Sequence, residues 1–196
     1  MKTPPIISYV EELSSASGLV AQRFQDIWEE LYPDNVIMIS PTGNILPEWL
    51  VLFESAVARY PTVNAKDYEM TCYRRWPCLY FFMLKNNIEG AWILDYDVLP
   101  NKEKPKFSFP TITKTTSYEH VACCYWLRED LKAFIHLLQS IPPWQIDRRH
   151  MSDMTIFDHK FRPPAGYEFS VTNYPDTRGD LIHFSGCHNK TAMLAY

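Results

Sequence analysis

Residues 79 to 99 are the most apolar stretch of the chain and constrain its fold more than any other segment. Six apolar residues follow one another from Leu79 to Leu84, which is typical of a strand buried on both faces. A second apolar run extends from about Ile88 to Val98. The intervening Lys85-Asn86-Asn87 predicts a tight turn, because Asn tolerates a positive φ. The pattern predicts a β-hairpin in the middle of a sheet, covered by helices or loops.

Helical periodicity is found on both sides of this hairpin. Apolar residues recur at helical spacing, and the three longest such segments are residues 19–31, 47–58 and 128–140. A shorter helix is predicted at residues 6–13. Pro47 suits the first position of its helix, and Glu129 and Asp130 fall in the first turn of the last one. We expect the three long helices to pack mainly on one face of the sheet.

Several shorter segments have strand character. They are residues 36–39, 68–73, 106–113, 118–126, 167–174 and 180–185. Together the elements predict an α+β fold with a mostly antiparallel sheet centred on the 79–99 hairpin. We expect one compact domain over residues 1–196, in which residues 145–196 close a sheet edge or form a C-terminal lobe.

Length and charge exclude some function classes. A chain of 196 residues with a net charge of −4 is unsuited to nonspecific binding of nucleic acid or anionic membranes. No apolar run reaches the roughly 18 residues that span a bilayer, and residues 1–5 do not resemble a secretory signal. The five cysteines are odd in number and form no CxxC pair, so we expect free thiols and a cytoplasmic location.

Asp95 and Asp97 are separated by one residue at the end of the second hairpin strand. Two carboxylates on one strand face could hold Mg²⁺ or Mn²⁺, as in metal-assisted phosphoryl chemistry. Strand alternation favours another interpretation, in which Leu94, Tyr96 and Val98 face the core and both aspartates face water. We favour the second interpretation, because a DxD pair by itself is a weak motif.

Histidines in the last 50 residues offer further ligands. The alternative enzyme hypothesis combines Asp95 and Asp97 with His183 and His188 as catalytic groups, or with His150 and His159 as metal ligands. The histidine spacing matches no standard zinc template, so we expect turn-rich surface instead and predict no cofactor. No GxSxG, P-loop or GxGxxG motif is present. Cys187 is expected to be an idle thiol, and Cys123 and Cys124 to line the core.

Binding to another protein is the function that conflicts least with the sequence. Aromatic residues make up 15% of the chain, and several lie beside arginine or proline, outside the periodic stripes. The predicted partner-binding residues are Arg74, Arg75, Trp76, Trp144, Arg148, Arg149 and Tyr174. We therefore predict a cytosolic partner-binding protein, of inhibitor, immunity or regulatory type, rather than an enzyme. The alternative is a metal-dependent hydrolase or nuclease built on Asp95 and Asp97.

Overall fold

The computed structural model describes residues 3–11, 15–41, 47–104, 107–109, 117–120, 122–142, 150–160, 169–185 and 187–196. Its contacts divide the chain into two compact units. The first unit contains Met1–Met38, Gly90–Trp126 and Pro163–Tyr196, and the second contains Ile39–Glu89 and Leu127–Arg162. The expectation of one domain over residues 1–196 stays a prediction, because units defined by contacts do not test whether either folds alone.

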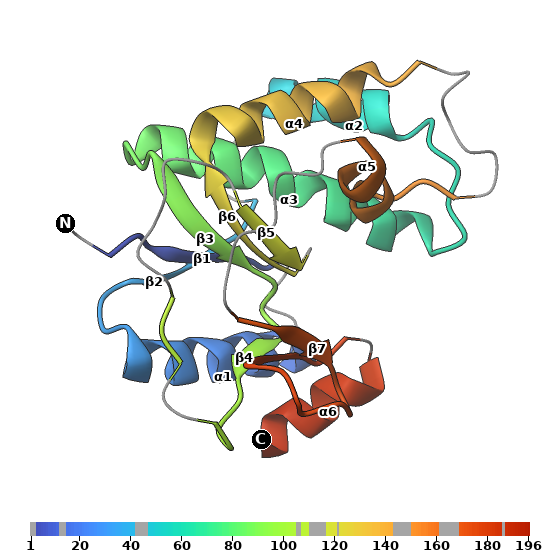
Figure 1. Cartoon of the computed structure of the whole chain (residues 1–196). Coiled ribbons are helices and arrows are strands. Elements are labelled where there is room, and N and C mark those ends of the chain that lie inside the picture. The colour runs from blue at the N-terminus through green and yellow to red at the C-terminus, as the bar shows by residue number, and fades with distance from the viewer. Residues whose placement is uncertain are drawn as a thin grey trace. The chain divides into compact units, whose positions relative to one another are not determined.

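A five-stranded sheet forms the centre of the first unit (Figure 1). Its order is β2-β1-β3-β6-β5, and β1 and β3 are parallel whereas β5 and β6 are antiparallel. Since β1 and β3 lie inside the sheet, nearly all of their residues are buried. The strands are β1 (Ile6–Tyr9), β2 (Val36–Ile39), β3 (Gly90–Leu94), β5 (Ser117–His120) and β6 (Cys123–Leu127).

A second, three-stranded sheet completes the first unit, with the order β4-β8-β7. β4 runs antiparallel to β8, and β7 runs parallel to β8. The indole of Trp28 in α1 donates a hydrogen bond of 2.9 Å to the carbonyl of Val98, which ties this helix to β4. The elements are β4 (Val98–Pro100), β7 (Val171–Asn173), β8 (Leu181–His183), α1 (Ser15–Leu31) and α6 (Cys187–Ala195).

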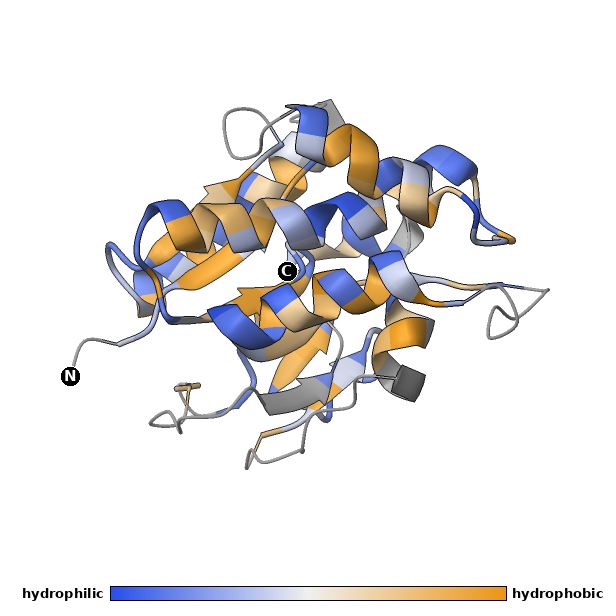
Figure 2. Ribbon diagram, turned by 90° about the horizontal axis from the view of Figure 1, so that it is seen from above, coloured by the Kyte–Doolittle hydropathy of each residue, from blue (hydrophilic) through white to orange (hydrophobic). Residues whose placement is uncertain are grey.

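The second unit is built from helices. α3 packs against α2 and α4, and α4 packs against α2 and α5. The rings of Phe53, Trp76, Phe134 and Phe157 are fully buried between them. Figure 2 shows hydrophobic and hydrophilic residues side by side along the helices, as expected when one face of each is buried. These helices are α2 (Pro47–Val57), α3 (Lys66–Lys85), α4 (Arg128–Ser140) and α5 (Asp153–Lys160).

The predicted 79–99 hairpin is wrong, because its first half is the end of helix α3. The buried residues Trp76, Leu79 and Met83 recur at spacings of three and four, which is a helical period. The half-buried positions between Leu79 and Met83 are also apolar, as is Leu84, which is 47% exposed. The continuous run therefore hid the helical period. The predicted turn does contain a residue with positive φ, since Asn87 has a φ of 52°.

Two other segments have the opposite structure from the one expected. Residues 6–13 were predicted as a helix, but β1 occupies Ile6–Tyr9 and is buried between two neighbouring strands. Residues 68–73 were predicted as a strand, but they lie in α3. Of the strand predicted at 106–113, residues 107–109 have no regular structure, and the rest lies outside the described residues.

The remaining elements largely follow the sequence pattern. The predicted helices at 19–31, 47–58 and 128–140 correspond to α1, α2 and α4, and α1 begins four residues earlier than expected. Residues 36–39 form β2, whereas the segment 118–126, predicted as one strand, contains parts of two paired strands, β5 and β6. Strands β7 and β8 fall within the predicted segments 167–174 and 180–185. Helices α5 and α6 were missed.

The fold is a mixed α/β arrangement with two small sheets and, among the described residues, six helices. The mostly antiparallel sheet is not supported, because each sheet contains both a parallel and an antiparallel pair. A parallel pair such as β1–β3 requires a long crossover, which a sequence pattern of local hairpins does not reveal. No helix within the described residues is both long and apolar enough to cross a membrane.

Candidate metal centre

Asp95 and Asp97 lie in a tight turn that follows β3. The amide of Asp95 donates to the carbonyl of Ala122 at 2.9 Å, and the amide of Val98 donates back to the carbonyl of Asp95 at 3.0 Å. β3 ends at Leu94 in one sheet, and β4 begins at Val98 in the other. The turn therefore lies at the carboxyl end of a parallel strand, which is the edge where α/β sheets usually bind ligands.

His183 reaches the same turn from the far end of the chain. β4 and β8 pair so that Val98 is opposite His183. The amide of Phe184 also donates to the carbonyl of Asp97 at 2.8 Å. The backbone pairing of the small sheet thus fixes the imidazole next to the aspartate turn.

Asp95, Asp97 and His183 form one cluster. One ligand atom from each of them lies within 4.8 Å of the ligand atoms of the other two. Asp97 is only 6% exposed and His183 only 8%, whereas Asp95 is half-buried. The expectation that both aspartates face water is wrong for Asp97. Strand alternation ends at Leu94, and the turn that follows directs the Asp97 carboxylate inward.

The orientation of His183 is set by Asn173. These residues are opposite each other in the β7–β8 pair, and the His183 Nδ1 atom lies 2.9 Å from the Asn173 Oδ1 atom. An amide oxygen only accepts, so we assign the donated proton to Nδ1. The Nε2 atom then faces Asp97, 3.4 Å from its Oδ1 atom. Metal-binding histidines are commonly held by such a hydrogen bond on their other nitrogen.

Charge is concentrated at this cluster. Burial raises the pKa of the Asp97 carboxyl, but the hydrogen bond and charge of His183, aided by Lys190, outweigh burial and lower the pKa below its usual value. Burial lowers the pKa of the His183 imidazole, but Asp97 and Asp95 outweigh that effect and raise the pKa. The buried Asp97 is therefore held as an anion by cationic neighbours.

Lys190 of α6 is one of these neighbours. Its Nζ atom lies 3.4 Å from the Asp97 Oδ2 atom and donates a 2.9 Å hydrogen bond to the Tyr96 hydroxyl. The same atom lies 4.5 Å from the centroid of the Tyr96 ring. Burial lowers the pKa of Lys190, but Asp97 and Tyr96 outweigh it and raise the pKa. A fixed cation therefore lies beside the carboxylates, where it can attract an anionic ligand.

The donor set fits a divalent cation. Two carboxylates and one imidazole suit Mn²⁺, which accepts oxygen and nitrogen ligands, better than Mg²⁺, which prefers oxygen alone. The three ligands also leave coordination positions for a substrate. Within the part of the chain that the structure describes, no other group of three His, Cys, Asp or Glu side chains meets the same distance condition.

The other histidines predicted from the sequence are placed differently. His188 lies in α6, close in sequence to Lys190, and His159 lies in α5, but the side chains of both are outside the described residues. His150 belongs to the second unit, where its Nδ1 atom accepts a hydrogen bond from the amide of Val63. Of the two predicted histidines whose side chains the structure describes, His150 and His183, only His183 joins Asp95 and Asp97.

The predicted partner-binding residues on α3 have contacts inside the second unit. Trp76 is 1% exposed, so it belongs to the core and cannot present its ring to a partner. Arg75 pairs with Asp153 at 2.8 Å, and Arg74 pairs with Glu54 at 2.6 Å.

The remaining predicted partner-binding residues are only partly described. Tyr174 stacks on Phe184, with ring centroids 5.0 Å apart. Trp144, Arg148 and Arg149 lie outside the described residues.

Sequence reasoning missed Asn173, Lys190 and His120 as neighbours of the cluster. The His120 ring centroid lies 5.4 Å from that of His183. None of the three belongs to a recognisable motif, and each is brought in by strand pairing or by the position of α6. One available signal was the run Ile93-Leu94-Asp95-Tyr96-Asp97, since acidic residues directly after a buried strand often mark the ligand edge of a sheet.

Comparisons with known proteins identify a similar fold. No protein-family model matches the chain, and no curated protein matches it in sequence. Among solved structures, the chain is similar to the crystal structure of a glycosyltransferase involved in the glycosylation of the major capsid of PBCV-1. The TM-score is 0.57 at 16% identity, over 98% of this chain and 100% of that one. At this identity the similarity concerns the fold alone.

Proposed function

We propose that the chain is a metal-dependent glycosyltransferase that uses a nucleoside diphosphate sugar as donor. The observation that carries this proposal is the convergence of Asp95, Asp97 and His183, with Lys190 beside them, at the end of β3. A divalent cation and a lysine side by side suit a donor that carries a diphosphate, because the diphosphate is negatively charged. The fold similarity to a glycosyltransferase along the full length of both chains supports glycosyl transfer over other metal-assisted reactions.

The residues of the cluster have separate roles in this proposal. Asp95, Asp97 and His183, the last after loss of the Nε2 proton, would hold Mn²⁺, which would offset the negative charge of the diphosphate. Asn173 keeps the His183 imidazole oriented through Nδ1. Lys190 contributes a second positive charge next to the same carboxylates, where the phosphate oxygens of the donor gather.

The reaction exchanges one bond at the sugar for another. The bond between the anomeric carbon and the diphosphate oxygen breaks, and its electron pair leaves with the nucleoside diphosphate. A new bond forms between the anomeric carbon and a hydroxyl oxygen of the acceptor, whose proton is released. Positive charge fixed near the diphosphate lowers the barrier, because negative charge accumulates there as the bond breaks.

Release of nucleoside diphosphate tests the proposal. The protein is incubated with Mn²⁺, a panel of uridine- and guanosine-diphosphate sugars, and mono- and disaccharide acceptors. We expect release with at least one donor, abolition by a chelator, and a loss of about 100-fold or more in Asp97→Asn, because a buried metal ligand is removed.

Asp176→Asn is the matched control. Asp176 is a carboxylate of the same unit whose side chain forms a surface pair with Arg178 at 2.7 Å and is not part of the ligand cluster, so this variant should retain full activity. Absence of release with every donor, or wild-type activity in Asp97→Asn, would contradict the proposal.

Two earlier hypotheses remain as alternatives. A metal-dependent hydrolase or nuclease would use the same carboxylates, and cleavage of DNA, RNA or simple phosphodiesters without sugar transfer would favour it. A cytosolic partner-binding role stays a prediction. The buried Trp76 cannot be part of the surface that would contact the partner. Affinity purification with Tyr174→Ala as the test variant addresses that role independently.

A further inference from the structure

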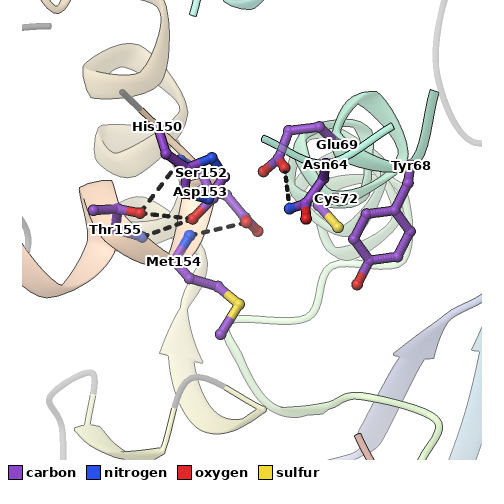
Figure 3. A pocket seen from close by; sticks show the side chains of 9 residues that line it. All are labelled: Asn64, Tyr68, Glu69, Cys72, His150, Ser152, Asp153, Met154 and Thr155. Carbon is purple, nitrogen blue, oxygen red and sulfur yellow. Dashed lines mark hydrogen bonds between the residues drawn. The ribbon is translucent and has the colours of Figure 1, made fainter. Parts of the chain in front are cut away.

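A separate pocket lies in the second unit, with a cavity volume of about 350 Å³ (Figure 3). One wall comes from α3 and the loop before it, and carries Asn64, Tyr68 and Glu69. The other wall comes from the start of α5 and the residues preceding it, and carries His150, Ser152 and Asp153. All of these residues belong to the second unit, whereas the metal cluster belongs to the first.

Asp153, one of two buried carboxylates in this pocket, is fully compensated. Its Oδ2 atom accepts hydrogen bonds from the Arg75 guanidinium at 2.8 Å and the Trp76 indole at 2.7 Å. Its Oδ1 atom accepts from the amide of Met154 at 2.9 Å. The charge of Asp153 is thus balanced by Arg75, and both of its oxygens are occupied.

Glu69 is different, because its carboxylate forms no ion pair among the described residues and accepts only from neutral groups. It is 4% exposed, and its Oε2 atom accepts from two neutral groups, the Thr62 hydroxyl at 2.9 Å and the Asn64 amide at 2.7 Å. No ion pair with Glu69 and no hydrogen bond to its Oε1 atom exists among the described residues. Figure 3 shows its carboxylate facing the opposite wall of the pocket. A buried carboxylate without a cation is costly, so this is a site that a positive ligand would stabilise.

His150 does not supply the missing positive charge. Its Nδ1 atom accepts a hydrogen bond of 3.3 Å from the amide of Val63, which requires that this nitrogen carry no proton. In this arrangement Nε2 is the ring nitrogen that can donate a hydrogen bond. Among the described residues that line this pocket, no cation pairs with the carboxylate of Glu69.

The geometry points to an organic cation rather than a metal ion. Among the described residues, the carboxylates, thiol and imidazole around this pocket do not meet the distance condition that Asp95, Asp97 and His183 meet. An ammonium group needs only one carboxylate and a few neutral acceptors. The Tyr68 ring, 60% exposed at the pocket, offers an aromatic face for the same cation.

We propose that this pocket binds a small primary amine, with its ammonium group contacting the Oε1 atom of Glu69. The Asn64 side chain donates through its nitrogen to Glu69, which leaves its amide oxygen as a second acceptor. The volume accommodates an alkyl or sugar-like body behind the ammonium group. The proposal is independent of glycosyl transfer, since it rests on residues of the other unit.

Titration calorimetry with 1,4-diaminobutane and butylamine tests the proposal, with glycerol and glucose as neutral probes. We expect the amines to bind and the neutral probes not to bind. Glu69→Gln should weaken amine binding about tenfold or more, because it removes the charge while keeping an acceptor for Thr62 and Asn64. Glu48→Gln, an exposed carboxylate on α2 of the same unit, is the matched control and should bind like the wild type.

Tyr68→Ala serves as a second variant if Glu69→Gln does not fold, since Tyr68 is exposed and its loss should weaken amine binding several-fold without unfolding. Amine binding that is unchanged in these pocket variants would overturn the proposal. Equal weakening in Glu48→Gln would do the same, because it would indicate general attraction to an acidic surface. Binding of glucose in place of the amines would identify a neutral ligand instead.

Discussion

Asp97 illustrates how much depends on single charges in this fold. A carboxylate that is 6% exposed is retained because His183 and Lys190 both contact it. Removing both cations would leave this buried negative charge without a positive partner among the described residues, which typically costs about 3–5 kcal/mol, and removing one should cost only part of that. This cluster therefore needs positive charge, and a bound divalent cation would satisfy the same need.

Asp180 gives a residue-scale prediction of pH dependence. Burial raises its pKa, but the hydrogen bonds from Ser170 and the Lys104 ammonium at 3.0 Å outweigh burial and lower the pKa below 3.8. A carboxyl whose pKa is lower in the folded state stabilises the fold above its unfolded pKa, and loses that effect as the pH falls through the folded value. Asp180→Asn should therefore lower the free energy of unfolding by about 1 kcal/mol near neutral pH.

Urea denaturation of wild type and Asp180→Asn at about pH 7 and about pH 3 checks this prediction. The difference in unfolding free energy should shrink at the lower pH, where the wild-type carboxyl becomes protonated. A difference that stays constant or grows on acidification would show that the ionised form of Asp180 is not what stabilises the fold.

The position or conformation of an individual residue could be predicted from the sequence only where its neighbours in the same segment determine it. Asp95 and Asp97 could be singled out because their spacing is visible in one segment, and a turn at residues 85–87 was expected because Asn tolerates a positive φ, which Asn87 has. The inward position of Asp97 could not be predicted, since it depends on where β3 ends. Asn173 and Lys190 could not be found at all, because nothing in their neighbouring residues distinguishes them.

Helix α3 is the element whose structure contradicts the sequence pattern most strongly. Its final turns contain apolar residues on every side, so neither a period of two nor one of 3.6 is visible there. Ring contacts account for some of the half-buried apolar positions. Phe81 meets Trp49 of α2 with centroids 5.0 Å apart. The helix is therefore specified by packing against α2 and α4 more than by its own pattern.

Trp76 provides a prediction about this element. Its ring packs edge-on against Phe134 of α4 at 5.2 Å, and its indole donates to Asp153 of α5. Trp76→Ala should therefore lower the free energy of unfolding by about 3–5 kcal/mol, because it removes a fully buried ring that joins three helices. Thermal and urea denaturation measure the loss.

Tyr68→Ala on the same helix is the comparison, since Tyr68 is 60% exposed and its removal should change the free energy of unfolding by about 0.5 kcal/mol or less. Near-wild-type stability in Trp76→Ala would mean that the indole is not a core group. It would then return to consideration as a partner-binding residue.

The arrangement of the whole molecule was the least accessible from sequence. Local helices such as α1, α2 and α4 follow from periodicity within one segment, whereas the β5–β6 hairpin was expected only as a single strand. The parallel β1–β3 pair and the β4–β8 pair join residues from distant parts of the chain. Because the metal cluster exists only through the second of these pairings, its carboxylates could be proposed beforehand but their histidine could not be chosen.

Calorimetric titration of the full chain with Mn²⁺ measures the central proposal most directly. We predict one binding site, lost in Asp97→Asn, weakened about 10-fold or more in His183→Ala, and unchanged in the surface control Asp176→Asn. Absence of Mn²⁺ binding to the wild type, or equal binding in Asp97→Asn, would contradict the assignment of Asp95, Asp97 and His183 as a metal centre.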